Sequence, residues 1–195
     1  IHSLRRALSL MPRLIILTFV RYYLPGFKAG GPIRTVSNMV EALGDEFEFR
    51  IVCADRDFMD TAPYPNIALN GWSQVGKAWV YYSHPVRWGF LNWIRLIRDT
   101  PHDLMYLNSF FDSGYTVSPL LAARAITTPT RPVVLAPRGE FSLGALGLKA
   151  WKKLPFLTMI KMLGLYRGLL WHASTDEEAK DIRQQMGETQ QIMVA

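Results

Sequence analysis

The sequence is poor in cysteine: Cys53 is the only one among 195 residues. An internal disulfide needs two cysteines and a cysteine-based metal cluster needs several, so both are excluded within this chain. Cys53 lies in the apolar run FRIVCAD, which predicts a buried, unreactive thiol, and a free thiol favours a reducing, cytoplasmic compartment. The four histidines do not have helical metal-ligand spacing, so we predict no metal site.

The sequence also lacks long apolar runs and dense basic blocks. The first apolar run, LIILTFV, is far shorter than the roughly 18 residues that a membrane-spanning helix needs. No Lys/Arg block with interleaved aromatic residues occurs, which argues against a nucleic-acid partner. The 22 basic residues are dispersed along the chain and, with 16 acidic residues, give a formal charge of +6. This balance suits anionic partners such as nucleotides, lipid phosphates or a membrane surface.

About half of the residues are apolar (49%), which is enough for one well-packed α/β domain that we place at residues 13–195. Residues 1–12 read as a leader of uncertain status. The first ten, IHSLRRALSL, show no convincing cleavage site, and Met11 resembles a natural start. A mis-assigned start, a tag remnant and a small anchor all remain open for this segment.

Strand and helix patterns alternate along the domain. The predicted strands are 13–20, 47–55, 77–83, 103–109, 131–137, 169–174 and a last one from 190, and the predicted helices are 32–43, 88–100, 114–126, 147–167 and 175–186. Residues 55–74 and 138–147 are expected to be loops. Such alternation is typical of right-handed βαβ units, so we predict a doubly wound parallel sheet, that is, a Rossmann-like α/β fold.

The apolar spacing predicts which helix residues face the core. They are Ile33, Val36, Met39, Val40, Leu43, Phe90, Trp93, Ile94 and Ile97. Pro155 is expected to kink or split its helix, and Ser174 or Thr175 to cap the helix that follows.

A loop rich in glycine, YYLPGFKAGGPIRTV, joins the first strand to the first helix. It matches neither a dinucleotide fingerprint nor a Walker loop. It does place Gly30 and Gly31 at a helix N-terminus, with Lys28 and Arg34 nearby, where free amides and the helix dipole favour an anion. The alternative is a simple turn whose glycines only supply positive φ angles.

Other candidates also follow predicted strands, where ligands bind in doubly wound sheets. Arg138 is suited to hold an anion by bidentate hydrogen bonds, unless a salt bridge to Glu140 uses it. Asn108 and its neighbour Ser109 can point into the same crevice, or Asn108 can bond its own backbone in a turn. Asp55 ends the second strand, as a ribose-binding acid would in a dinucleotide-binding protein, although the glycine fingerprint is missing.

The stretch from Lys149 to Arg167 mixes five basic residues with large apolar ones. A basic amphipathic helix of this kind can lie in a membrane interface. The alternative, which we rate about equal, is a core helix with an ordinary solvated basic side.

Several segments together resemble family 4 glycosyltransferases. They are PGFKAGGPIRTVSNMVEAL, DEFEFRIVCADRD, VYYSHP, DLMYLNSFF, PVVLAPRGEFSLGALGLKAWKK and GLLWHASTDEEAKDI. The similarity extends over residues 13–183 in the order of the family. These are retaining enzymes of the GT-B architecture, with two Rossmann-like domains facing across a cleft, and the similarity covers the N-terminal, acceptor-side domain.

The resemblance implies roles for specific residues. Gly30, Gly31 and Arg34 would lie near the diphosphate of a nucleotide-sugar donor, which is a substrate, so that no cofactor is expected. Arg138 stands where many relatives carry a histidine that contacts the transferred sugar, so this contact cannot be copied unchanged. Together with Asn108, Gly139 and Glu140, it would line the acceptor or sugar side.

The resemblance also implies a hexosyltransferase acting on a glycan or lipid-linked acceptor, peripheral to the inner face of a membrane. Relatives hold the donor mainly on a second domain, through two glutamates eight positions apart that have no counterpart here. We therefore expect the 195 residues alone to be inactive. The alternatives are a non-catalytic Rossmann-like module, completed by another chain or regulatory, and, more weakly, a nicotinamide dehydrogenase.

Overall fold

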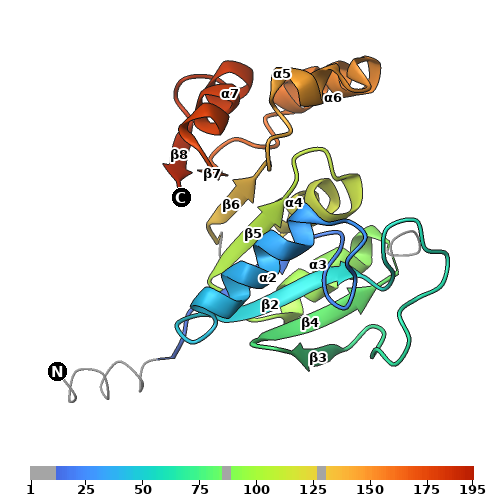
Figure 1. Cartoon of the computed structure of the whole chain (residues 1–195). Coiled ribbons are helices and arrows are strands. Elements are labelled where there is room, and N and C mark those ends of the chain that lie inside the picture. Colours follow the sequence, from blue (N-terminus) through green and yellow to red (C-terminus); the bar gives the residue numbers. More distant parts are fainter. Residues whose placement is uncertain (1–11, 85–88, 127–130) are drawn as a thin grey trace.

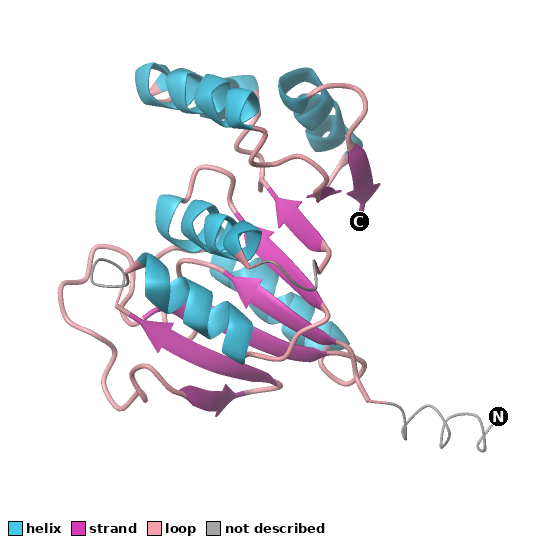
Figure 2. Ribbon diagram, turned by 180° about the vertical axis from the view of Figure 1, so that it is seen from behind, coloured by secondary structure: helices cyan, strands magenta, loops and turns pink. Residues whose placement is uncertain are grey.

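A computed structural model describes residues 12–84, 89–126 and 131–195, and these residues form one mostly parallel, eight-stranded sheet flanked by helices (Figures 1 and 2). The strands are β1 (Ile15–Phe19), β2 (Glu48–Ala54), β3 (Trp72–Val75), β4 (Ala78–Ser83), β5 (Leu104–Asn108), β6 (Val133–Ala136), β7 (Leu170–Ala173) and β8 (Gln191–Val194). The helices are α2 (Gly31–Leu43), α3 (Phe90–Asp99), the π-helical turn η1 (Ser113–Val117), α4 (Ser118–Ala125), α5 (Leu143–Gly147), α6 (Ala150–Leu163) and α7 (Asp176–Met186). The predicted α/β class is confirmed.

The strand order is β3-β4-β2-β1-β5-β6-β7-β8. Apart from β3, neighbouring strands pair in parallel. Numbered along the chain without β3, the strands run 3-2-1-4-5-6-7, which matches the order of a doubly wound sheet. The order reverses between β1 and β5, and the crevice beyond the carboxyl ends of the strands at such a switch point is where these sheets bind ligands.

Helix α2 and the remaining helices cover opposite faces of the sheet. Residues alternate between the faces along each strand, so Leu17 and Phe19 of β1 join a core with α3, α4, α6 and α7. The other face packs on α2 through Val36 and Val40. The larger core contains an aromatic group around Phe110, whose ring is stacked on that of Tyr166 at a centroid distance of 4.5 Å. Phe110 and Phe141, from the loops after β5 and β6, pack against each other in this group, so the two loops are anchored in the core.

Helix α2 begins and ends close to the predicted residues. Pro32 stands in the first turn, where its missing N–H costs no hydrogen bond, and the N–H of Gly44 bonds the carbonyl of Val40 at the end. Ile33, Val36 and Val40 are buried as predicted. Met39 is half-buried and Leu43 is 37% exposed, so the predicted core face is too wide at its C-terminal end.

Two predictions about the elements and one about a core residue are wrong. The predicted loop 55–74 runs into β3, which pairs antiparallel with β4, so the sheet is not purely parallel. A tight turn through Gly76, with φ +59°, joins the two strands, and the rings of Trp72 and Tyr81 make an edge contact across the pair. The predicted loop 138–147 contains the short helix α5. Phe90, predicted to face the core, is 46% exposed.

Two further details concern the helices around the site. Helix α6 continues past Pro155 and ends at Leu163, where Gly164 adopts φ +63°, four residues earlier than predicted. The side chain of Thr175 accepts a hydrogen bond from the Glu178 N–H, so Thr175 is the cap of α7.

Within the described ranges, no helix has both the length and the apolar character that crossing a bilayer requires.

Candidate functional site

A cleft of about 490 Å³ lies at the carboxyl ends of the strands, and we call it the Arg138 cleft. Three loops meet there: the loop after β1 that leads into α2, the loop after β6, and the loop after β7 that leads into α7. The lining residues are Gly31, Pro32, Thr35, Arg138, Gly139, Ser142, Ser174, Thr175, Glu177, Glu178 and Asp181. The cleft therefore lies at the edge where the strand order predicts ligand binding.

The N-terminus of α2 forms one wall of this cleft. Gly30 precedes the helix with φ +66° and ψ −110°, a conformation that residues with a side chain rarely adopt. A Cβ built on Gly31 would meet no atom within 4 Å, so the backbone lies open to the cleft. No side chain caps the helix; since Pro32 has no N–H and the Arg34 N–H bonds the Gly30 carbonyl at 3.2 Å, the N–H groups of Gly31 and Ile33 are the donors that this helix end can offer. An anion is favoured at such a helix end.

The two basic side chains of the glycine-rich loop do not line the Arg138 cleft. Arg34 is exposed on α2 and is absent from the lining residues. The Nζ of Lys28 pairs with the Asp60 carboxylate at 2.5 Å. The structure thus brings Gly31 together with Arg138 and Gly139 and sets Arg34 apart from them.

Arg138 projects from the loop after β6 and is held by neutral acceptors. Its Nε and Nη2 donate to Asn108 Oδ1 at 3.2 and 3.0 Å, and Nη2 also donates to the Tyr106 hydroxyl at 2.9 Å. Asn108 is buried and is fixed by its own amide, which donates to the Phe19 carbonyl at 3.3 Å. Asn108 is therefore a support for Arg138 and not a turn residue bonded to its own backbone. None of these partners neutralises the guanidinium charge.

The hydrogen bonds of Arg138 continue into a chain whose direction is set at its other end. A carbonyl only accepts, so His172 Nε2, 3.4 Å from the Ala195 carbonyl, carries the proton of the neutral ring. Nδ1 is then the acceptor, and the Tyr106 hydroxyl, which accepts from Arg138, donates to it at 2.6 Å. Burial, together with the charge of Arg138, lowers the pKa of His172, which keeps the ring neutral near pH 7.

Strained backbone marks the same place. Ser109 and Arg138 are non-glycine residues with φ +75° and φ +59°, and Gly139 has φ +75°. Ser109 directly follows β5, and Arg138 and Gly139 lie in the loop after the adjacent strand β6. Left-handed conformations at residues with a Cβ cost about 1–3 kcal/mol and are concentrated at functional sites. This observation supports the cleft as a binding site.

Glu140 points away from Arg138, and no ion pair between the two occurs among the described residues. Its carboxylate accepts hydrogen bonds from Ser109 Oγ at 2.7 Å and from the Phe110 and Phe111 N–H groups at 2.5 and 3.2 Å. Burial raises the pKa of Glu140, and these bonds oppose the rise only in part. Glu140 therefore fixes the loop after β5 instead of lining the cleft.

The acidic wall of the cleft comes from α7, which the sequence did not single out as a site. Glu178 is only 7% exposed, and its two oxygens accept from the Gly139 and Ser174 N–H groups, each at 2.7 Å. Glu177 and Asp181 line the cleft directly. The pattern Thr-Asp-Glu-Glu is a helix-start signal, but the bond from Glu178 to Gly139 joins two distant loops and leaves no trace in the sequence.

A second cleft of about 380 Å³ lies at the same sheet edge, after β1, β2 and β4, and we call it the Arg56 cleft. Its residues are Arg21, Tyr22, Ala54, Arg56, Asp57, Met59, Asp60, Thr61 and His84. Arg21 binds both oxygens of Asp112, at 2.7 and 2.6 Å, and Arg56 binds both oxygens of Asp55, at 2.7 and 3.1 Å.

The Asp55 carboxylate is thus occupied by a neighbouring arginine, which disfavours its use on a ribose. Asp57 accepts from the N–H groups of Phe27, Lys28 and Phe58. Burial acts to raise the pKa of Asp57, but these three bonds outweigh it and the pKa is lowered. Asp57 is therefore an anchor for the glycine-rich loop.

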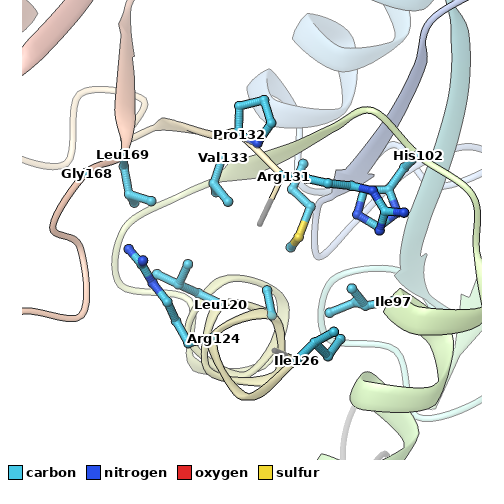
Figure 3. A pocket seen from close by; sticks show the side chains of 12 residues that line it. Ile97, His102, Leu120, Arg124, Ile126, Arg131, Pro132, Val133, Gly168 and Leu169 are labelled. Carbon is cyan, nitrogen blue, oxygen red and sulfur yellow. The ribbon is translucent and has the colours of Figure 1, made fainter. Parts of the chain in front are cut away.

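A cavity of about 640 Å³ lies at the opposite, amino end of the strands (Figure 3). Apolar residues including Ile97, Leu120 and Ile126 line it, and His102 and Arg131 lie close together on one side. His102 Nδ1 lies 2.7 Å from the Thr100 carbonyl. Since doubly wound sheets bind ligands at the other edge, we do not assign this cavity to the site.

No group of histidine, cysteine or acidic side chains suited to a metal ion occurs within residues 12–84, 89–126 and 131–195. Comparison of the sequence with models of known protein families gave no match, and comparison with curated proteins gave no significant one. The resemblance to family 4 glycosyltransferases therefore stays a prediction, and the geometry of the cleft carries the functional argument.

Proposed function

We propose that this chain is the N-terminal, acceptor-side domain of a retaining glycosyltransferase of the GT-B type. The full enzyme would transfer a hexose from a nucleotide-sugar to a glycan or lipid-linked acceptor, in the cytoplasm at the inner face of a membrane. The motif order in the sequence and the doubly wound sheet support this proposal. The Arg138 cleft would be one wall of the interdomain active site.

The proposal rests on the charge of Arg138, which no carboxylate partner neutralises among the described residues. Its side chain faces a cleft shared with the open N-terminus of α2, and its hydrogen-bond partners in the described residues are the neutral Asn108 and Tyr106. A guanidinium without a carboxylate partner keeps its charge available to phosphate oxygens. The bonds to Asn108 and Tyr106 use Nε and Nη2, which leaves Nη1 for a ligand.

The walls of the cleft suit different parts of a sugar phosphate. Arg138 and the Gly31 backbone would contact the phosphate oxygens, where negative charge develops as the sugar–phosphate bond breaks. Glu177 and Asp181 on the opposite wall would accept hydrogen bonds from sugar hydroxyls. A ligand that is anionic at one end and rich in hydroxyls at the other matches both walls.

Transfer requires the leaving diphosphate to be surrounded by donors and cations on all sides, in a site that excludes water. The Arg138 cleft supplies one side. In the proposed enzyme a second domain supplies the other, so we expect the purified 195 residues to bind ligand without turning it over. Turnover by these residues alone would contradict the proposal that a second domain is needed.

Ligand-observed NMR on the purified chain tests the proposal. The panel contains a UDP-sugar, a GDP-sugar, UDP, uridine and NAD. We expect binding of at least one diphosphate compound, absence of uridine binding, and a tenfold or larger loss in Arg138→Ala. Arg34→Ala removes the same charge from α2 outside the cleft and is the matched control, with an expected change below twofold.

The other outcomes point to the alternatives. Saturable binding of NAD without any nucleotide-sugar would favour a dinucleotide-binding module. Diphosphate binding that is equal in wild type and Arg138→Ala would place the ligand elsewhere and remove the argument for this cleft.

A further inference from the structure

Helices α5 and α6 expose a set of large apolar side chains that a surface does not usually carry. The two helices lie together beyond β6, at the edge of the molecule (Figure 1). The exposed residues are Leu143 (79%), Leu148 (70%), Trp151 (74%), Leu154 (50%), Met159 (49%), Met162 (83%) and Leu163 (70%). We call them the α5–α6 surface. Contiguous exposed apolar side chains of this kind mark an interaction site.

The outer side of α6 carries Trp151 and Met162, which with Pro155 and Thr158 are spaced by four, three and four positions and so lie on one side. Leu157 and Ile160 lie on the opposite side and are buried in the core. Helix α6 thus has large apolar side chains on both sides, whereas a helix at the surface of a protein normally has one polar side. The structure describes nothing that covers the outer side.

Charge distinguishes the α5–α6 surface from the rest of the chain. Residues 141–175 contain no aspartate or glutamate, and they contain five basic residues: Lys149, Lys152, Lys153, Lys161 and Arg167. The other 160 residues hold the remaining 17 basic side chains and all 16 acidic ones. Almost the whole net charge of +6 therefore comes from this one stretch.

The lysines border the apolar face. Lys152 and Lys161 are exposed, and Lys152 Nζ lies 4.6 Å from the centre of the Trp151 ring. Lys153 turns inward, where its Nζ donates to the Ala145 carbonyl at 2.6 Å and lies over the Phe111 ring. The exposed tryptophan and methionines beside lysines match the chemistry of a helix that lies in a membrane interface.

We propose that the α5–α6 surface docks on an anionic lipid bilayer. Trp151 and Met162 would insert at the boundary between the headgroups and the acyl chains, and the lysines would lie at the lipid phosphates. A second copy of the chain would bring like charges together at this surface. The N-terminal residues 1–11 carry two arginines and no acidic residue, so they are not complementary either. An anionic bilayer offers both the apolar layer and the opposite charge.

The position of the surface relates it to the Arg138 cleft. Ser142 lines the cleft and caps α5, and the next residue, Leu143, begins the α5–α6 surface. Docking would therefore place the cleft beside the lipid headgroups, where an acceptor carried on a lipid would be within reach. The docking inference rests on the chemistry of the surface and does not need the proposed transferase activity.

Vesicle co-sedimentation of the purified chain tests this inference. One set of vesicles contains phosphatidylcholine with 30% phosphatidylglycerol and the other phosphatidylcholine alone. We expect at least tenfold stronger partitioning to the anionic vesicles, and a further loss of tenfold or more at 0.5 M NaCl, because surface electrostatics are screened. Equal partitioning to both vesicles, or absence of binding to either, would overturn the inference.

Substitutions test whether the α5–α6 surface is the part of the protein that contacts the bilayer. The double variant Trp151→Glu and Met162→Glu is expected to lose at least tenfold in partitioning. Leu91→Glu, at a 64% exposed apolar residue of α3, is the matched control and is expected to change it less than twofold. Equal losses in both would overturn the assignment to the α5–α6 surface.

Sedimentation velocity without lipid, together with circular dichroism to confirm folding, separates lipid docking from self-association. A wild-type dimer that becomes monomeric in the double variant would identify a second copy as the occupant and contradict the proposal.

Discussion

The Arg138 cleft and the Arg56 cleft lie at the same edge of the sheet, but their arginines have different hydrogen-bond partners. In the Arg56 cleft, Arg21 and Arg56 each bind both oxygens of an aspartate, Asp112 and Asp55. In the Arg138 cleft, the arginine is held by an amide oxygen and a phenol. The carboxylate of the nearby Glu178 is bonded to backbone N–H groups instead.

The presence of an arginine at a strand end therefore does not by itself indicate a binding site. Arg21 connects the end of β1 to the cap of η1, because Asp112 also accepts from the Gly114 and Tyr115 N–H groups. Its charge is already neutralised. Arg138 is positioned equally well, yet its charge is not neutralised, so it retains the capacity to bind an anion.

The largest expected effect comes from breaking the Arg21–Asp112 pair. Asp112→Ala would leave Arg21 without its partner and two N–H groups of η1 without a cap, and we expect a loss of about 3 kcal/mol in the free energy of unfolding. Urea denaturation measures it. Asp60→Ala breaks the exposed pair with Lys28 and is the control, with an expected loss below about 1 kcal/mol. Similar losses in the two variants would contradict a structural role for Arg21.

The next-largest effect is a loss of stability from a substitution at the N-terminus of α2, beside the Arg138 cleft. Gly30→Ala forces a side chain into φ +66° and ψ −110°, so we expect a loss of about 2 kcal/mol in stability. Gly31→Ala adds a Cβ in open space at a helical position, so stability should change by less than about 0.5 kcal/mol. Thermal unfolding of the two variants distinguishes them. A destabilised Gly31→Ala protein would mean that the backbone at Gly31 is not open to the cleft.

The sequence predicted the layers of the fold but not the partners of its charged residues. Buried strands such as β1 and helices such as α2 follow from apolar runs and from the positions of proline and glycine, which are local signals. The sequence also placed Arg138, Gly139 and Gly31 at strand ends, and the topology brings these together. It could not show that Glu140 turns toward Phe110, or that Glu178 reaches Gly139, because such contacts depend on how distant loops pack.

Loss of Arg138 itself should cost little stability. In Arg138→Ala, Asn108 Oδ1 loses two hydrogen bonds from a partly exposed side chain, and water entering from the cleft can replace them. We expect a loss of about 1 kcal/mol in urea denaturation, well below that of Asp112→Ala. A loss as large as that of Asp112→Ala would mean that Arg138 is a structural residue like Arg21, and the contrast between the clefts would disappear.

The smallest effect is a pH dependence through His172. The folded state lowers the pKa of His172, so the unfolded chain binds the proton more readily. Its contribution to stability is therefore complete above about pH 6.5, the ordinary histidine value, and is lost as the pH falls through the lowered pKa. His172→Gln should flatten this part of the curve of unfolding free energy against pH. His102, whose pKa burial also lowers, remains in both proteins, so the difference between the curves isolates His172.

Isothermal titration of a nucleoside diphosphate into wild type and Arg138→Ala, with the matching nucleoside as reference ligand, tests whether Arg138 holds an anion in this cleft. We expect wild type to bind the diphosphate at least tenfold more tightly than the nucleoside, and Arg138→Ala to lose this preference while remaining folded. If both proteins bind the diphosphate with the same affinity, or if neither binds it, the claim that Arg138 holds an anion in this cleft is contradicted.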